Sequence, residues 1–324
     1  ATTDENVWTN VGAGSGDVAP ATWYGARGIV GGGYTPSSST NIIEYITIAT
    51  TGNMTDFGDL TISRFGLAAC SGGTRGVFGG GKNHPGSGSM NTIDYVTLAT
   101  PGNAIDFGDL TQSRWGLSSG SNGYRGLWCG GTIPSDGAGS TNIIDYATIA
   151  TPANAIDFGD LTTRDYQSGG QNISYQRTGA ISHETRCVIG GGEYINVLDY
   201  VTIATTGNAT DFGDLITARA YAGTVFSLTR GVWAGGSSPA VVNSIEYITI
   251  ASTGNGTDFG DLTGSRTYGV NGCSNLTRGV FCGGYQGGYT NIMDYITIAT
   301  PGNAADFGDL SAGRGETLGA CSGD

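Results

Sequence analysis

The residues best suited to chemistry are the paired acids of a short motif that the chain repeats. Asp-Phe-Gly-Asp-Leu starts at Asp56, Asp106, Asp157, Asp211, Asp258 and Asp306. In the first copy, Asn53, Asp56 and Asp59 offer side-chain oxygens close together in the sequence, and calcium takes about six to eight oxygen ligands. One hypothesis is therefore a calcium site at this motif. The competing interpretation is that the carboxylates accept hydrogen bonds from turn amides and pair with arginines, which would fix one repeat to the next.

Twelve of the 13 arginines recur at two positions of the repeat, which favours the second interpretation. One position holds Arg64, Arg114, Arg164, Arg219, Arg266 and Arg314, and the other holds Arg27, Arg75, Arg125, Arg186, Arg230 and Arg278. Because only Arg177 lies outside these positions, a sialidase-like arginine cluster for a substrate carboxylate cannot be assembled without structural residues. The two histidines, His84 and His183, lie in different repeats. The sequence therefore predicts a protein that is not an enzyme and needs no cofactor.

These side chains are positioned by six sequence repeats, whose copies start near residues 41, 91, 142, 196, 243 and 291. Within one copy we expect strands over 64–70, 75–78, 42–49 and 57–60, the third of which alternates apolar and polar residues. A Gly-Asn turn often follows the third strand, as at Gly52-Asn53, and is suited to positive backbone dihedrals. Six four-stranded sheets predict an all-β fold, a six-bladed β-propeller.

The chain ends indicate how this ring closes. Residues 314–323 match residues 64–72 with one residue added, so the C-terminal strand is expected to join the N-terminal blade. An open array would instead need capping repeats. The predicted propeller covers residues 23–324, and residues 1–22 lie outside the repeat register as an arm or linker.

Charge and cysteine placement narrow the class of protein. The net charge of −13 and a single lysine, Lys82, oppose nucleic-acid binding. No apolar run is long enough for a membrane span, and no signal peptide is visible at the N-terminus. Cys70, Cys273 and Cys321 occupy equivalent positions, so we interpret the cysteines as small buried residues. Cys273 and Cys282 are the one pair placed to form a disulfide.

The repeat resembles the kelch repeat, in which Arg-x-Gly, a Gly-Gly pair, an aspartyl-tyrosine strand and an aromatic residue succeed one another. The corresponding residues are Arg64, Gly66, Gly79-Gly80, Asp94-Tyr95 and Phe107, and Phe stands where kelch repeats carry Trp. In its amino-acid sequence, the repeat is similar to those of tail-associated and structural proteins of marine bacteriophages, cyanophages in particular. That resemblance implies a virion component exposed at the particle surface, hence a virion or extracellular location.

The loops between the second and third strands vary most, and strand alternation places all six on one face. They cover 34–40, 82–90, 132–141, 193–195, 237–242 and 285–290. Their candidate ligand-binding residues are Tyr34, His84, Asp136, Tyr194, Tyr285 and Tyr289, a composition typical of adaptable recognition loops, although soluble loops without a ligand are an equal alternative. One insertion, 169–184, is expected on the opposite face, where Tyr175, Arg177 and His183 could dock a neighbouring subunit.

Two functions follow from these observations. The first is a non-enzymatic binding module on a phage particle, of the tail-fibre type, which recognises a host glycan or another surface ligand through the variable loops. The second is a purely structural or assembly component of the virion, docked to other virion proteins or to copies of itself by residues 1–22 or 169–184. A glycan-active enzyme is a third and weaker alternative, because it would need an acid pair without arginine partners.

Overall fold

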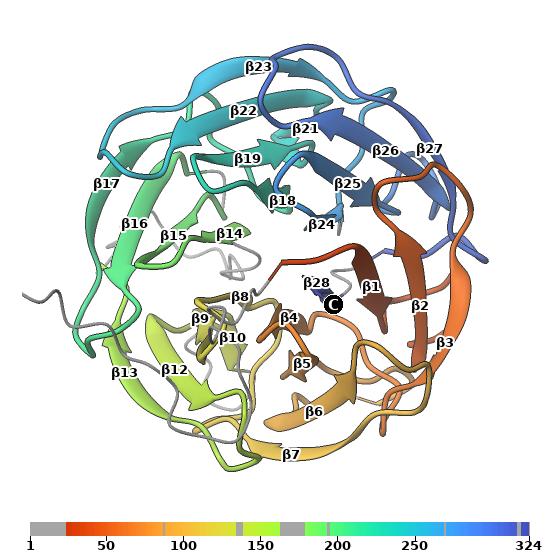
Figure 1. Ribbon diagram of the computed structural model, residues 1–324, viewed down its shortest axis with the longest axis vertical. Coiled ribbons are helices and arrows are strands. Elements are labelled where there is room, and N and C mark those ends of the chain that lie inside the picture. The colour runs from red at the N-terminus through yellow and green to blue at the C-terminus, as the bar shows by residue number, and fades with distance from the viewer. Residues whose placement is uncertain are drawn as a thin grey trace, which may run out of the picture.

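The computed structural model describes residues 24–86, 88–133, 139–162, 179–192, 195–268, 270–315 and 319–323. Six four-stranded antiparallel sheets stand around a central axis like the blades of a propeller (Figure 1). All regular elements of the described residues are strands, and these residues contain no helix with the length and hydropathy that a bilayer crossing needs. The all-β, six-bladed architecture with four-stranded blades is therefore confirmed.

Each blade extends from an innermost strand beside the axis to an outermost strand at the rim. From the axis outward, blade 1 consists of β28 (Gly319–Gly323), β1 (Arg27–Gly31), β2 (Ile42–Thr47) and β3 (Thr55–Asp59). Blade 2 consists of β4 (Ala68–Ser71), β5 (Arg75–Gly79), β6 (Thr92–Thr97) and β7 (Ile105–Asp109). Blade 3 consists of β8 (Ser118–Ser121), β9 (Arg125–Cys129), β12 (Ile143–Thr148) and β13 (Ile156–Asp160).

The other three blades follow the same order. Blade 4 consists of β14 (Gly179–Ser182), β15 (Arg186–Gly190), β16 (Val197–Thr202) and β17 (Thr210–Asp214). Blade 5 consists of β18 (Gly223–Phe226), β19 (Arg230–Ala234), β22 (Ser244–Thr249) and β23 (Thr257–Asp261). Blade 6 consists of β24 (Asn271–Ser274), β25 (Arg278–Cys282), β26 (Ile292–Thr297) and β27 (Ala305–Asp309). Two short ribbons extend loops: β10 (Thr132–Ile133) pairs with β11 (Gly139–Ser140), and β20 (Ser237–Ser238) with β21 (Ala240–Val241).

The ring closes inside blade 1, as predicted. The C-terminal strand β28 pairs antiparallel with β1, with Arg27 opposite Gly323 and Gly31 opposite Gly319. In Figure 1 this places the last strand beside the first one near the axis. The predicted arm, residues 1–22, lies outside the described residues.

One strand begins later than the sequence predicts. The innermost strand of blade 2 was expected from residue 64 but starts at Ala68. Arg64 instead turns its side chain into the protein, where it is fully buried, and Gly66 has φ +68°. This left-handed conformation, which suits glycine, breaks the extended backbone before the strand begins.

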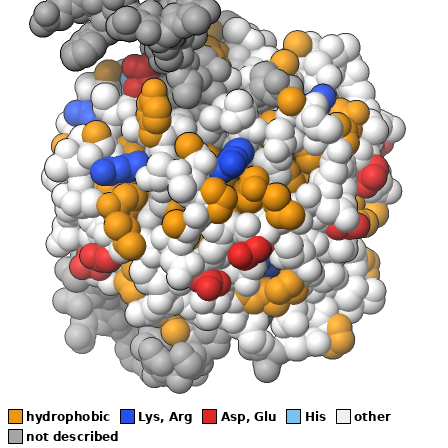
Figure 2. All heavy atoms as spheres, turned by 60° about the horizontal axis from the view of Figure 1, so that its bottom comes forward, with side chains coloured by type: hydrophobic (Ala, Val, Ile, Leu, Met, Phe, Trp, Pro, Cys, Tyr) orange, Lys and Arg blue, Asp and Glu red, His pale blue; other side chains and the backbone are white. Residues whose placement is uncertain are grey.

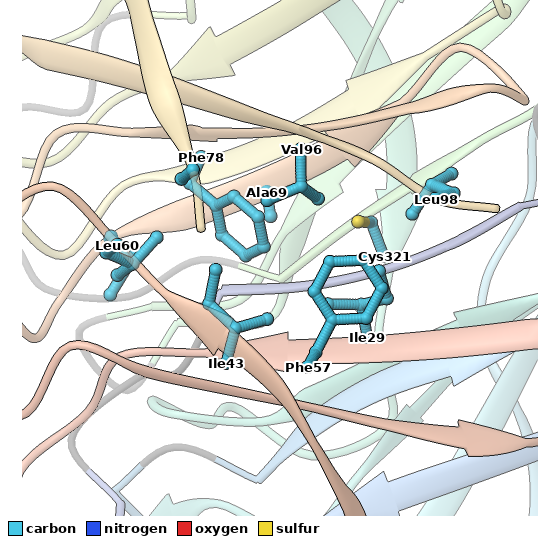
Figure 3. Close-up of a cluster of buried hydrophobic side chains, with 11 residues drawn as sticks. Ile29, Ile43, Phe57, Leu60, Ala69, Phe78, Val96, Leu98 and Cys321 are labelled. Carbon is cyan, nitrogen blue, oxygen red and sulfur yellow. The ribbon is translucent and has the colours of Figure 1, made fainter. Parts of the chain in front are cut away.

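The core of the ring lies between the blades. Six clusters of buried hydrophobic side chains each combine residues of two neighbouring blades. Figure 3 shows the cluster between blades 1 and 2, where Ile29, Ile43 and Phe57 face Phe78 and Val96. Both faces of each blade are therefore covered, and Ile43 and Glu44, which point to opposite faces of the third strand, are both buried.

Near the axis, the blades fit together through a side chain that lies on a glycine. At five interfaces the innermost strand supplies the side chain and the second strand of the next blade supplies the glycine: Cys321 on Gly76, Cys70 on Gly126, Ile181 on Gly231, Val225 on Gly279 and Cys273 on Gly28. At the interface of blades 3 and 4 the arrangement is reversed. There Gly120 lies on the innermost strand, and a Cβ at Gly120 would lie 2.6 Å from Cys187 Sγ of the next blade.

Four of the six cysteines, Cys70, Cys187, Cys273 and Cys321, take part in this packing. All six, Cys70, Cys129, Cys187, Cys273, Cys282 and Cys321, are buried free thiols, so the interpretation as small buried residues is confirmed and the Cys273–Cys282 disulfide is absent. Burial raises the pKa of the Cys321 thiol to about 12. Charged side chains are also few on the surface shown in Figure 2, where hydrophobic side chains lie between them.

Candidate functional site

The first set of repeated arginines forms buried ion pairs where neighbouring blades meet. The described pairs are Arg64–Asp94, Arg114–Asp145, Arg219–Glu246, Arg266–Asp294 and Arg314–Glu44. Arg64 Nη2 lies 2.9 Å from Asp94 Oδ2, and neither side chain is exposed. Burial lowers the pKa of the Arg64 guanidinium, and the Asp94 carboxylate opposes that shift. Asp94 also accepts hydrogen bonds from the hydroxyl and the amide of Thr61 in the preceding repeat.

The acids in these pairs are not the ones that the sequence indicated. They come from the third strand, whereas Asp56 and Asp59 take part in none of the ion pairs between described residues. The predicted pairing of Asp56 and Asp59 with arginine was therefore wrong. Asn53, the third member of the candidate calcium site, uses its Oδ1 atom to accept a hydrogen bond from the Asp309 amide. In the described part of the chain, no group of three or more His, Cys, Asp or Glu residues could hold a metal ion.

The repeated asparagine covers the outer edge of the preceding blade. Asn103 Oδ1 accepts a 3.1 Å hydrogen bond from the Asp59 amide, and the Ala104 amide donates to the Asp59 carbonyl over 2.8 Å. The equivalent side-chain bonds join Asn53 to Asp309, Asn154 to Asp109, Asn208 to Asp160, Asn255 to Asp214 and Asn303 to Asp261. None of these asparagines has a positive φ. Asparagine is needed for its carboxamide and not, as predicted, for its backbone conformation.

The second set of arginines also joins neighbouring blades. Arg75 Nη1 donates to the carbonyls of Ile149 and Ala150 in blade 3, at 3.0 and 2.8 Å. Its guanidinium lies 4.6 Å from the centroid of the Tyr95 ring, a distance suited to a cation–π interaction. The same contact with a tyrosine of the third strand recurs at Arg27, Arg125, Arg186, Arg230 and Arg278. The repeated charges therefore hold the ring together.

The variable loops gather on one face of the ring. Because antiparallel strands alternate in direction, the loops between second and third strands share this face with the connections from each outermost strand to the next blade. We call it the loop face. The described ends of the connection from β13 to β14 lie on this face, whereas the insertion 169–184 was predicted on the opposite one. His183, in the β14–β15 turn, does lie on the opposite face. Residues 169–178 of the insertion, with Tyr175 and Arg177, lie outside the described residues.

Four of the six predicted ligand-binding residues come together on the loop face. Tyr34 is central: its ring centroid lies 5.3 Å from that of His84 and 5.7 Å from that of Tyr289, and Tyr289 lies 5.5 Å from Tyr285. The Tyr34 hydroxyl is 3.3 Å from His84 Nδ1. The other two predicted residues, Asp136 and Tyr194, lie outside the described residues.

These tyrosines belong to a longer row of rings, which we call the aromatic arc. Its members, in spatial order, are Tyr221, Tyr268, Tyr285, Tyr289, Tyr34, Phe65 and Trp115. Successive centroids are 4.7, 5.8, 5.5, 5.7, 5.1 and 6.0 Å apart, and the rings meet edge to face or tilted. Such contacts fix ring orientation. The arc includes residues from blades 5, 6, 1, 2 and 3.

Four members of the arc are not among the residues predicted from the sequence: Phe65, Trp115, Tyr221 and Tyr268. Tyr221 and Tyr268 occupy the position that Gly66 and Gly116 fill in blades 2 and 3, and they keep the positive φ of those glycines, at 65° and 53°. A bulky residue in this conformation is strained, and such strain gathers at functional sites. The signal in the sequence is the loss of Arg-x-Gly, which becomes Arg-Ala-Tyr221 and Arg-Thr-Tyr268.

Backbone bridges hold the arc in place. Tyr34 forms bridges with Gly315 and Ser39, and Tyr285 forms bridges with Thr267 and Tyr289. The Ser39 amide and hydroxyl both donate to the His84 carbonyl, at 3.1 Å, which ties the loops of blades 1 and 2 together. The rings are therefore preorganised by the scaffold rather than carried on loops without tertiary contacts.

Lys82 lies over the end of the arc formed by Phe65 and Trp115. Its Nζ atom is 4.0 Å from the centroid of the Trp115 ring and 5.3 Å from that of Phe65. Phe65 and Trp115 are buried, with 6% and 9% of their surface exposed, whereas the tyrosines of the arc are half-buried or exposed. Phe65 and Trp115 thus form a base beneath Lys82, and the tyrosines provide the accessible ring surface.

The arc borders the central channel, where Tyr221 is one of the lining residues. The channel has a cavity volume of about 90 Å³, and mainly small residues of the six innermost strands line it. Deeper in the channel, serine hydroxyls link the blades: Ser121 donates to the Ser71 carbonyl, Ser71 to Ser322 and Ser322 to Ser274, over 2.5–2.6 Å. The hydroxyls of these channel serines are therefore bonded to backbone carbonyls of the neighbouring blade.

The structure supports the resemblance to kelch repeats only at the level of the propeller fold. No family model matches the chain, and no curated protein is significantly similar to it. The architecture is therefore established by the structure itself.

Proposed function

We propose that this protein is a non-enzymatic binding module that recognises a polysaccharide through the aromatic arc. The observation that carries the proposal is the row of five accessible tyrosines, Tyr221, Tyr268, Tyr285, Tyr289 and Tyr34, in mutual ring contact on one face. Sugar rings present apolar C–H faces that pack on aromatic rings, and their hydroxyls bond to tyrosine hydroxyls. A continuous row would contact several sugar residues of one chain.

Preorganisation supports this proposal. The bridges that hold Tyr34 and Tyr285 fix the rings before a ligand arrives, so little side-chain entropy would be lost on binding. The strained backbone of Tyr221 and Tyr268 supports the same conclusion, since glycine would satisfy the fold at these positions without strain. Binding is favoured over catalysis because the described arginines join blades to one another. The likeness of the repeat to phage structural proteins is the reason to place the module on a virion surface, facing host glycans.

The test is binding of the protein to a panel of bacterial surface polysaccharides, with and without calcium. Saturable binding is expected, and Tyr285→Ala and Tyr268→Ala should each weaken it about tenfold, the loss that corresponds to about 1.4 kcal/mol. Tyr124→Ala is the matched control, because Tyr124 is 60% exposed but lies in the β8–β9 turn on the opposite face. Loss of binding on calcium removal would support the calcium hypothesis.

Two results would overturn the proposal. One is the absence of saturable binding to every polysaccharide on the panel, which would favour the structural role in the virion. The other is an equal effect of Tyr124→Ala and Tyr285→Ala, since binding would then not depend on the aromatic arc.

A further inference from the structure

We propose that the polysaccharide is anionic, and that Lys82 binds its acidic group while neighbouring sugar rings lie along the tyrosines of the aromatic arc. This inference rests on the proposed function and names its substrate class. It concerns one residue whose type, position and surroundings differ from those of every other basic residue that the structure describes.

The distribution of basic residues is the first argument. Lys82 is the only lysine in a chain of net charge −13. The described arginines are engaged between blades, either in buried ion pairs such as Arg64–Asp94 or in bonds to carbonyls such as Arg75 to Ala150. A chain with so few basic groups places its single lysine ammonium over two rings of the aromatic arc. The sequence requires no lysine there, since the equivalent position holds Tyr34 in blade 1 and Thr132 in blade 3.

The base beneath Lys82 is the second argument. The Trp115 and Phe65 rings hold the ammonium group by their faces, and a cation–π contact of this kind leaves ammonium N–H donors directed away from the rings. Because the two rings are buried, they lower the local dielectric and strengthen an ionic bond to a ligand. Lys82 is also held by the bridges of its backbone to Phe65 and Ser89.

The continuity of the site is the third argument. Phe65, which supports Lys82, contacts Tyr34, and Tyr34 contacts both His84 and Tyr289. The exposed His84 imidazole lies on the same loop as Lys82 and meets the Tyr34 hydroxyl. An acidic sugar at Lys82 would therefore have its neighbours along the chain beside Tyr34, Tyr289 and Tyr285. Lysine acts as a compact point charge, so its binding to an anion does not depend on a planar acidic group. Both carboxylated and sulfated glycans therefore carry an acidic group that Lys82 could bind.

The experiment measures binding to four probes: polygalacturonate, dextran sulfate, uncharged dextran and an uncharged galactan. The wild-type protein should bind at least one anionic probe more tightly than both neutral ones, and affinity should fall as salt rises. Lys82→Met, which keeps the aliphatic stem on Trp115, should weaken anionic binding about tenfold, whereas Lys82→Arg should retain most of it. Polygalacturonate and dextran sulfate distinguish a carboxylate from a sulfate ligand.

The outcomes separate this inference from the proposed function. If a neutral glycan binds as tightly as the anionic ones and Lys82→Met has no effect, the anionic ligand is refuted while the glycan-binding arc stands. If Lys82→Met loses binding only together with thermal stability and Lys82→Arg loses both equally, Lys82 has a packing role and the inference fails. If no probe or bacterial polysaccharide binds, both proposals fail. The net charge of −13 opposes nonspecific attraction of polyanions, so the loss of binding in Lys82→Met identifies a specific contact.

Discussion

The reversed contact between blades 3 and 4 permits a sharp test of how the ring is assembled. At the other five interfaces a side chain of the innermost strand lies on a glycine, but here Gly120 faces Cys187. Gly120→Cys would restore the usual side chain on the innermost strand, and Cys187→Gly would restore the usual glycine. Each change alone should be harmful, and the two together should produce the arrangement of Cys70 and Gly126.

The structure sets the magnitudes. In Gly120→Cys the new Cβ would lie 2.6 Å from Cys187 Sγ, and overpacking of this kind costs about 1–3 kcal/mol. Cys187→Gly removes a fully buried side chain and adds strand flexibility, which together cost about 2 kcal/mol. In the double variant the clash is absent and the space is refilled, so we expect a loss of about 1 kcal/mol or less. The nearest remaining atom, Ser182 Cβ at 3.2 Å, must shift slightly.

The assay is urea unfolding of the wild-type protein, both single variants and the double variant, under reducing conditions that prevent a disulfide. The double-mutant cycle should give a favourable coupling of about 2–4 kcal/mol. Gly52→Ala serves as the control, because a Cβ at Gly52 would meet no atom within 4 Å, and its effect should stay within about 0.5 kcal/mol. Additive losses in the double variant would refute the reasoning, because they would show that the two positions do not share one space.

Three further predictions concern the contacts between blades. Asp94→Ala should destabilise the protein by about 3–5 kcal/mol in thermal or urea unfolding, because it leaves the buried Arg64 guanidinium without its partner; an effect below about 1 kcal/mol would contradict the buried pair. Asn103→Ala should cost about 1 kcal/mol by removing the acceptor of the Asp59 amide, and amide hydrogen exchange at Asp59 should accelerate. Burial raises the pKa of Cys321 from 9.0 to about 12, so the folded state keeps a proton that the unfolded state loses. Its contribution is complete below about pH 9 and declines between about pH 9 and 12, so the alkaline loss of stability should be shallower in Cys321→Ala.

Much of the fold follows from repetition alone. The six Asp-Phe-Gly-Asp-Leu motifs indicate six blades, and the match between residues 314–323 and 64–72 indicates closure by the last strand. The partners within the repeat are harder to predict, because several acids recur with the same period. Burial distinguishes the acid that pairs with arginine from the others, because Asp94 is fully buried beside Arg64 whereas Asp56 is exposed. Periodicity shows that a residue is structural without showing which residue it contacts.

The candidate site was predictable only in part, for a related reason. Tyr34, His84, Tyr285 and Tyr289 lie in loops whose sequences differ between repeats, and this variability indicates candidate binding residues. Tyr221 lies two residues after the repeated structural arginine Arg219, so the replacement of the glycine of Arg-x-Gly is a weak signal within a repeated structural segment. The base under Lys82 depends on Phe65 and Trp115, which vary little in chemical type from the core residues around them. Only the three-dimensional arrangement shows that these rings meet.

The closure of blade 1 has a consequence for the order of events on the ribosome. Strands β1, β2 and β3 are synthesised before the other strands of the described propeller, but their innermost partner β28 is synthesised after those strands. Throughout the synthesis of blades 2 to 6, the inner edge of β1 lacks its partner, and unpaired strand edges invite association with other chains. The seam between blades 6 and 1, where Cys273 packs on Gly28, likewise cannot form until blade 6 has been synthesised. The synthesis of β28 therefore allows an open, association-prone arc of blades to become a sealed ring.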